Sequence, residues 1–171
     1  LGAGSNILFT KTFEGLLLKM EIMGIKKLKE TASEVFLEVG AGENWHHFVI
    51  YCVQKGWGGV ENLSLIPGTV GAAPIQNIGA YGTELKDVFI SLNAIELTTG
   101  KSKHFTKEDC HFDYRYSIFK GAIKGKYLVT DIQLKLAKNP KANLSYKAIQ
   151  KEFEDKDAEE ISIREVFDKV V

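Results

Sequence analysis

The chain has 171 residues, 44% of them hydrophobic, and its 22 basic residues balance 22 acidic ones. A chain of this size can bury one substantial core, and the neutral balance lacks the basic surface that nucleic acids and anionic membranes require, so we expect neither as a partner. Cys52 and Cys110 have no metal-ligand spacing, and there is no signal peptide or long apolar run. We therefore expect a cytoplasmic protein whose cysteines pack as small hydrophobes.

The first half of the chain predicts short strands followed by a helix. Residues 15–20 and 34–39 are apolar segments bounded by glycine or polar residues, which favours two strands. Asn44 is a suitable N-cap for a helix from Trp45, because apolar residues recur there at helical spacing and Gly56 supplies a stop.

The second half predicts strands first and helices last. Residues 87–98 alternate and then change phase at Ile95, which indicates a bulged strand, and Thr99-Gly100 turns the chain into a strand at 101–106. A further strand is expected at 127–136, with helices at about 145–154 and 162–171, the second opened by a capping box. Because the strands come mostly in succession, the fold class is α+β.

The run of residues 61–82 has neither helical nor strand periodicity. It contains glycines at 68, 71, 79 and 82 between apolar residues. Glycine tolerates positive φ and leaves the backbone N–H unshielded, so the run suits a loop wrapped around a flat or phosphorylated ligand. An ordinary buried turn region is the alternative.

A second glycine loop lies at Gly2-Ala3-Gly4-Ser5-Asn6. A Rossmann fingerprint needs a third glycine and a helix behind it, whereas Ile7-Leu8-Phe9 favours an extended strand. The loop can still form an uncharged nest for an anion, with a plain turn as the alternative.

Four ordered stretches carry a family resemblance. They are Leu1–Asn6, Val39–His46, the run 61–82 and Phe112–Lys120. Together they resemble the UDP-N-acetylenolpyruvoylglucosamine reductases of peptidoglycan synthesis. The resemblance implies the two-subdomain FAD-binding fold of the vanillyl-alcohol oxidase type. Residues 1–40 would end the first subdomain and 41–171 would form the second. We expect a chain truncated at both ends, with the C-terminal substrate domain absent.

The resemblance also implies a cofactor site for FAD, with NADPH as reductant. The glycine loop would hold the FAD diphosphate through Gly2, Ala3, Gly4, Ser5 and Asn6. The long run would line FAD through Ile66, Gly68, Gly71, Ala72, Gln76 and Gly79, and Val129 would lie near the adenine end. For Ile66 and Val129, core packing is the alternative. No histidine, cysteine or tyrosine lies in the first loop, so we expect non-covalent FAD.

The implied substrate is a UDP-sugar, and Arg115 is the implied catalytic residue. A guanidinium forms paired hydrogen bonds with a carboxylate, so Arg115 can hold the enolpyruvyl carboxylate. Without the resemblance, Tyr-Arg-Tyr is typical of a surface arginine lying on aromatic rings. Tyr81, Tyr114 and Tyr146 are the implied substrate-binding residues. His46 and His47 lack partners at ligand spacing, so we expect no metal.

Part of the family's catalytic machinery has no counterpart in this sequence. The family protonates its substrate from a serine in a Gly-Ser-Phe-Phe type motif, assisted by a glutamate, and no such motif occurs here. The chain by itself is therefore expected to be inactive. Two other functions remain open at this point, an FAD-dependent oxidase of the same superfamily and a non-enzymatic nucleotide-binding module.

Overall fold

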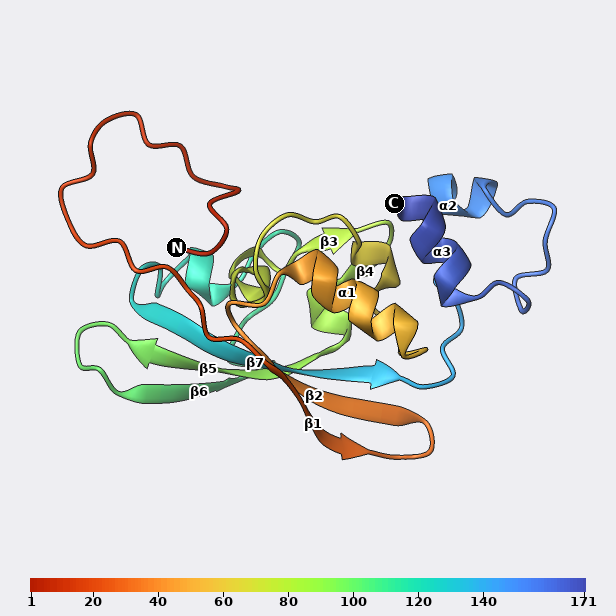
Figure 1. Ribbon diagram of the computed structural model, residues 1–171, viewed down its shortest axis with the longest axis horizontal. Coiled ribbons are helices and arrows are strands. Elements are labelled where there is room, and N and C mark those ends of the chain that lie inside the picture. Colours follow the sequence, from red (N-terminus) through yellow and green to blue (C-terminus); the bar gives the residue numbers. More distant parts are fainter.

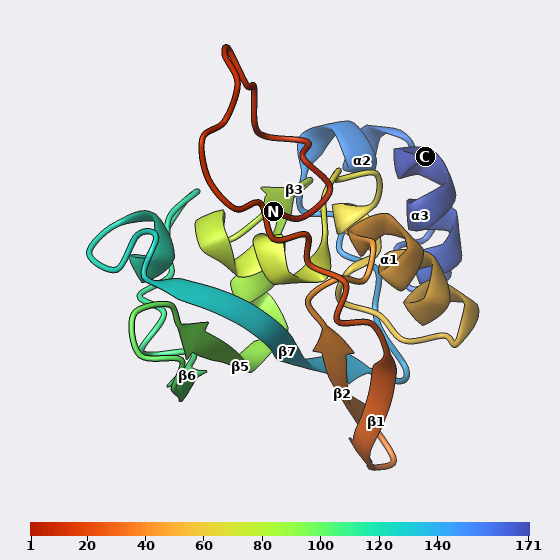
Figure 2. The same ribbon diagram turned by 60° about the vertical axis from the view of Figure 1, so that its left-hand side comes forward.

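A five-stranded antiparallel sheet forms the centre of the computed structural model, which describes residues 1–171. The strand order is β1-β2-β7-β5-β6. The strands are β1 (Ile25–Glu30), β2 (Glu34–Gly40), β5 (Phe89–Glu96), β6 (Ser102–Thr106) and β7 (Tyr127–Ala137). Figures 1 and 2 show that the helices and the run 61–82 lie together on one face of this twisted sheet.

The core lies between that face and helix α1 (Trp45–Gln54). Alternate residues of β2 are fully buried, and their neighbours on β7 are buried as well, as in the pair Leu37 and Leu134. Trp45 and Phe48 cover these strands from α1 and are each 1% exposed. Each buried side chain of this size contributes about 1.5–3 kcal/mol, so the sheet face and α1 form one stable scaffold.

Most predicted elements are confirmed. Asn44 caps α1, its side chain accepting a hydrogen bond from the His47 N–H at 2.9 Å. The predicted bulged strand is β5, whose pairing with β7 shifts register at two places. Helix α3 (Ile163–Val170) begins with the predicted capping box, whereas α2 (Lys147–Lys151) is shorter than expected and continues as turns. Both cysteines are free and buried.

The predictions for the first 24 residues are wrong in two places, and the strand that follows them was missed. Residues 7–9 and 15–20 form no strand, and Leu16 is 80% exposed. A strand needs partners along its length, whereas here only Leu18 and Met20 are bonded to another segment: Leu18 accepts from the Leu1 amino group and Met20 donates to the Leu1 carbonyl, both at 2.8 Å. The missed strand is β1, a lysine-rich edge strand whose exposed side chains give no apolar alternation.

The N-terminal segment is anchored where it reaches the sheet. Gly42 donates to the Ile22 carbonyl at 2.8 Å and Gly40 to the Gly24 carbonyl at 2.9 Å. A Cβ atom on Gly40 would lie 2.4 Å from the Ile22 carbonyl oxygen, so glycine is required for this close approach. The predicted subdomain boundary at residue 40 stays a prediction; β2, on one side of it, pairs along its length with β7 on the other.

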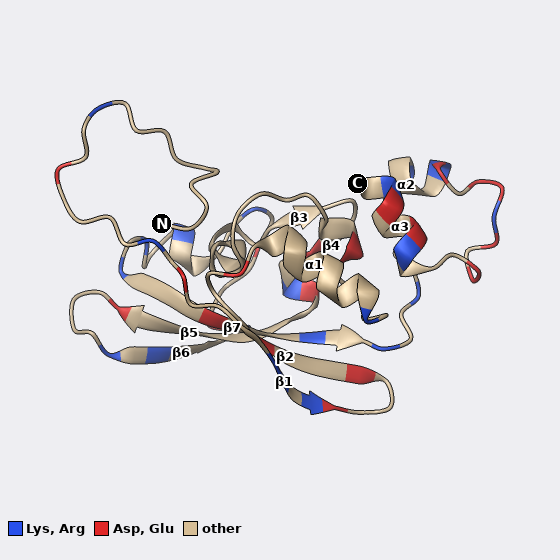
Figure 3. Cartoon of the chain, viewed as in Figure 1, with Lys and Arg blue, Asp and Glu red and all other residues tan.

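Charged residues of both signs are interspersed over the strands and over α3 (Figure 3). The run 61–82 contains only Glu61 as a charged residue, so the region above the centre of the sheet is largely free of charge. No helix of the structure has the length and apolar character needed to cross a membrane.

Candidate functional site

The run 61–82 folds as successive tight turns over the core. It contains two 3₁₀ segments, η1 (Glu61–Leu63) and η2 (Val70–Gln76), and ends in a hairpin of β3 (Gly79–Ala80) and β4 (Thr83–Glu84), followed by η3 (Leu85–Asp87). Its middle pairs with the chain before α1, where Gly71 donates to the Ala41 carbonyl at 2.9 Å. The run is thus fixed to the scaffold by its own backbone.

The two predicted glycine loops meet in space. A Cβ atom on Gly2 would lie 2.6 Å from the Thr69 hydroxyl oxygen, and one on Gly68 would lie 3.5 Å from the Ser5 hydroxyl oxygen. These contacts join residues that are more than sixty positions apart in the sequence. The structure therefore brings together the two halves of the predicted cofactor site.

Both loops offer backbone donors that are free. The N–H groups of residues 2–6, Ile66 and Gly68 donate to no other group of the protein. Successive free N–H groups of this kind form a nest for an anion such as a diphosphate. The N–H groups of Gly71 and Ala72 instead donate to carbonyls within the protein, so these two residues can line a ligand only by their shape.

A small cavity of about 180 Å³ lies beside these loops, and we call it the glycine cavity. Four of the predicted cofactor residues line it, namely Gly2, Gly71, Ala72 and Val129. The prediction missed Met20, Ala41, Thr69 and Ile75, which also line it. Because cavities for whole cofactors measure about 300–1,000 Å³, the glycine cavity can enclose only one part of a dinucleotide. Ile66 and Gln76 line neither the glycine cavity nor the larger cavity that contains Arg115.

A larger cavity of about 740 Å³ contains all the predicted substrate residues. Tyr81, Tyr114, Arg115 and Tyr146 line it from three separate segments, and we call it the tyrosine cavity. The rings of Tyr81 and Tyr146 meet edge to face with centroids 5.5 Å apart. Gly79, which we predicted as a cofactor residue, lines this cavity too. The run 61–82 thus contributes to both cavities.

The tyrosine cavity is built on strained turns. Tyr81 and Gly82 form a two-residue hairpin turn with φ of 47° and 79°, and Arg115 has φ of 52° at the tip of a turn closed by Asp113 and Tyr116. A left-handed conformation costs a residue with a side chain about 1–3 kcal/mol, and such strain is concentrated at functional sites. None of the ten ion pairs of the chain involves Arg115, so its guanidinium is free to bind an anion.

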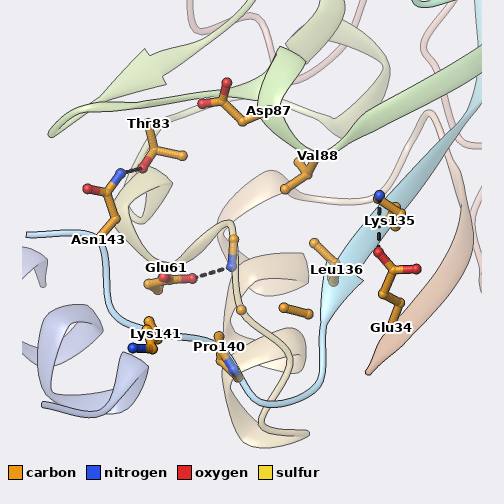
Figure 4. Close-up of a pocket in the computed structure, with 13 residues that line it drawn as sticks. Glu34, Glu61, Thr83, Asp87, Val88, Lys135, Leu136, Pro140, Lys141 and Asn143 are labelled. Carbon is orange, nitrogen blue, oxygen red and sulfur yellow. Dashed lines mark hydrogen bonds and ion pairs between the residues drawn. The ribbon is translucent and has the colours of Figure 1, made fainter. Parts of the chain in front are cut away.

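Behind the hairpin lies a third cavity of about 380 Å³, which shares Thr83 and Asp87 with the tyrosine cavity (Figure 4). Burial raises the pKa of Glu61, which accepts a hydrogen bond from the Gly59 N–H at 2.6 Å. Asn143 donates to the Thr83 hydroxyl at 3.0 Å. No predicted site residue lines this cavity, and its polar groups hold the hairpin from behind.

One histidine contacts the run. The His46 ring stacks on Phe167, and its Nδ1 accepts a hydrogen bond from the Leu65 N–H at 3.2 Å, next to Ile66. Burial and the neighbouring His47 lower the pKa of His46. Burial raises the pKa of Cys110 to about 12 and also raises that of Cys52, so neither thiol is a nucleophile at neutral pH. No group of three side chains could hold a metal ion.

Comparison with known proteins identifies the class to which this fold and these loops belong. Residues 1–106 match the model of the FAD binding domain family. The chain belongs to this family, and its α+β FAD-binding fold is the one predicted. FAD is accordingly the cofactor of this family, as the sequence predicted.

The most informative relatives carry one name. The chain is similar to the UDP-N-acetylenolpyruvoylglucosamine reductase of Amoebophilus asiaticus, with 52% identity over 171 residues that cover all of this chain and 50% of the relative. It is 44% identical to the reductase of Flavobacterium johnsoniae over all of this chain and 51% of that protein. The chain thus spans about half the length of these relatives.

A solved structure supports the fold. The crystal structure of UDP-N-acetylenolpyruvylglucosamine reductase from Thermus caldophilus matches 78% of this chain and 41% of its own, with a TM-score of 0.57 and 24% identity.

Proposed function

We propose that the chain is the flavin-binding half of an NADPH-dependent UDP-N-acetylenolpyruvoylglucosamine reductase, which forms UDP-N-acetylmuramate for peptidoglycan in the cytoplasm. The observation that carries this proposal is that one segment, the run 61–82, joins the FAD loops to a cavity lined by Arg115 and three tyrosines. The full-length similarity of this chain to reductases of that name supports the same substrate.

The residues present fit FAD in two ways. The free N–H groups of residues 2–6, Ile66 and Gly68 suit the diphosphate, since they offer several donors without a competing positive charge. The apolar walls of the glycine cavity, including Val129, suit a flat ring. When bound there, FAD would supply the hydride-transfer chemistry between NADPH and the enol ether.

In this proposal Arg115 holds the substrate by its carboxylate. The turn from Asp113 to Tyr116 places Arg115 at the tip, where it lines the tyrosine cavity and has no ion-pair partner. A planar guanidinium binds the two carboxylate oxygens together and favours the extra negative charge that this group takes up during reduction. Arg115 is thus both a binding and a catalytic group.

The tyrosines would hold the nucleotide-sugar against the cavity wall. Tyr81 and Tyr146 support each other through their edge-to-face contact, and both are partly exposed, so their faces and hydroxyls can contact a ligand. Tyr114 is 77% exposed next to Arg115 and can cover the substrate from the other side. These assignments rest on position and on chemical type.

We further propose that the chain holds FAD without a covalent bond. His46 faces Phe167 and the Leu65 N–H, and both cysteines are buried in the core. A cradle of backbone groups exists only in the folded protein, so denaturation should release the flavin.

The experiment compares the intact reductase with this chain. NADPH oxidation that requires the enolpyruvyl nucleotide is expected from the intact protein and is expected to be absent from the chain alone, which lacks the family's proton donor. Acid precipitation of the yellow intact protein should leave fluorescent flavin in the supernatant. NADPH oxidation independent of the nucleotide would favour an oxidase, and a colourless intact protein would favour a nucleotide-binding module. Flavin that remains in the pellet would contradict the non-covalent site.

A further inference from the structure

A buried asparagine lies in the sequence between Ile75, which lines the glycine cavity, and Gly79, which lines the tyrosine cavity. Asn77 follows η2 directly, is 0% exposed, and has φ of 45°. Asparagine is the residue other than glycine that most readily adopts this left-handed conformation. Its backbone therefore lets the run turn from the glycine cavity toward the hairpin of the tyrosine cavity.

The Asn77 side chain links three segments of the chain. Its Nδ2 donates to the Asp113 carbonyl at 3.1 Å and to the Glu84 carboxylate at 3.2 Å, while its Oδ1 accepts from the Lys86 N–H at 3.0 Å. Both amide hydrogens and the amide oxygen are thus used. In a fully buried position such a satisfied amide fixes its partners in place, because breaking any one bond leaves a polar group unpaired.

One of these partners is the base of the Arg115 turn. Asp113 and Tyr116 exchange backbone hydrogen bonds at 3.2 and 3.1 Å, with Tyr114 and Arg115 at the tip. A second bond joins the same two regions, since the buried Ser117 hydroxyl donates to the Ile75 carbonyl at 2.7 Å. The Arg115 turn is therefore attached to the end of the cofactor-binding run at two points, which are two residues apart on the run and four residues apart on the turn.

We propose that Asn77 is the positioning residue for Arg115, which sets the guanidinium at a fixed place relative to the flavin-binding run. This inference rests on the proposed function and adds to it a residue that touches neither cavity. The strained φ of 52° at Arg115 needs such support, since an unsupported turn would relax away from it. Glycine at position 77 would allow the same backbone but would lose all three bonds. Aspartate would keep the acceptor but would place a carboxylate against the Glu84 carboxylate and the Asp113 carbonyl.

The first test measures proteolysis and needs no enzyme activity. It uses the fact that the chain contains only two arginines, Arg115 and Arg164. An arginine-specific protease therefore cuts the 171-residue chain at the proposed turn and at one internal reference site, Arg164 on α3, which pairs with Asp168. We expect Asn77→Asp and Asn77→Gly to speed cleavage after Arg115 on the order of tenfold, the effect of losing about one buried hydrogen bond, with cleavage after Arg164 unchanged.

The matched control is Asn62→Asp. Asn62 is also a buried asparagine that donates to two carbonyls, those of Tyr81 and Asn143, but it does not contact the Arg115 turn. Its substitution should leave the ratio of cleavage at the two arginines as in the wild type. An unchanged ratio in both Asn77 variants, or an equal rise in the control, would overturn the proposal. If Asn77→Asp fails to fold, Asn77→Gly and Ser117→Ala keep the test decisive.

The second test is a double-mutant cycle in the intact reductase. Asn77→Asp is expected to slow flavin reoxidation by the enolpyruvyl nucleotide about tenfold while flavin reduction by NADPH is retained. In an Arg115→Lys background the same substitution should have little further effect, because Asn77 acts through Arg115. Additive losses would overturn the positioning role. A wild-type flavin that the nucleotide does not reoxidise would count against the proposed function alone, because the cleavage ratio would still report on Asn77.

Discussion

The glycine cavity and the tyrosine cavity share one segment but are built in opposite ways. No charged side chain lines the glycine cavity, and its lining is mostly apolar, with glycine and alanine residues beside larger ones such as Met20 and Tyr127. Arg115, Glu84, Asp87 and three tyrosines line the tyrosine cavity, which rests on strained turns. A cofactor that stays bound can be held by shape and backbone donors, whereas a substrate that must be recognised and released needs side chains. We therefore expect substitutions in the glycine cavity to lower stability and flavin content, and substitutions in the tyrosine cavity to lower substrate binding or turnover.

The largest expected effect concerns Arg115→Lys in the intact reductase. A point charge replaces the planar guanidinium, so the proposed paired bonds to the substrate carboxylate could not form, and turnover should fall on the order of 100-fold, about 2.7 kcal/mol. Flavin content and flavin reduction by NADPH should be nearly unchanged, because the glycine cavity is intact. Stopped-flow absorbance measures the two steps separately. Near-normal reoxidation by the nucleotide would remove Arg115 from the mechanism.

Gly71→Ala should damage the other cavity by loss of stability. The added Cβ would lie 2.4 Å from the Ala41 Cβ, so the run must shift away from the core, at about 1–3 kcal/mol. Urea unfolding of the chain measures this loss, and flavin content of the intact protein should fall with it. The matched rescue is Gly71→Ala with Ala41→Gly, which removes the closest contact. A single variant as stable as the wild type would show that the run is not tightly packed.

Tyr146→Leu should have a smaller effect, confined to substrate binding. It removes the edge-to-face contact with Tyr81, and such contacts contribute about 0.5–1.5 kcal/mol, so KM for the nucleotide should rise about two- to tenfold. The turnover number should change little, since Arg115 keeps its place. Steady-state kinetics at saturating NADPH give both constants, and a fall in turnover at unchanged KM would speak against this role.

The smallest effect is a pH dependence of stability at the edge of the run. The pKa of His46 is lowered in the folded chain. At a pH below the ordinary histidine pKa of about 6.5, the unfolded chain therefore binds more protons than the folded chain. The contribution of His46 is then complete above that pH and is lost as the pH falls through its folded pKa. The difference in unfolding free energy between wild type and His46→Gln should therefore be larger at pH 7.5 than at pH 5. An equal difference at both pH values would contradict the neutral His46 acceptor.

Elements with local signals could be predicted from the sequence. The capped helix after Asn44, the alternating strand β7 and the capping box of α3 each depend on neighbouring residues only, and all three are present. Residues 15–20 look like a strand, but they join no sheet and only Leu18 and Met20 bond to another segment, at Leu1. Strand formation depends on pairing rather than on composition. Strand β1 was missed for the converse reason, because its pairing with β2 outweighs a lysine-rich, exposed sequence.

The sequence predicted the residues that line the candidate site but not the residues that hold them in place. The structure places Tyr81, Tyr114, Arg115 and Tyr146 in one cavity, as the family resemblance implied, while their roles stay predictions. Asn77 could not be found in the same way, because its contact with Asp113 spans 36 residues. Its only local signal is an asparagine between glycine-rich turns. Thr69 and Ala41 were missed because their importance lies in how closely a glycine approaches each of them.

The most direct test of the whole account follows the flavin of the intact protein through its two half-reactions without oxygen. NADPH is expected to bleach the flavin when no nucleotide is present, and UDP-N-acetylenolpyruvoylglucosamine is then expected to restore the colour. The first step tests the flavin site proposed for the glycine loops, and the second step tests the tyrosine cavity. A reduced flavin that oxygen reoxidises but the enolpyruvyl nucleotide does not would contradict the assignment of this chain to the reductase.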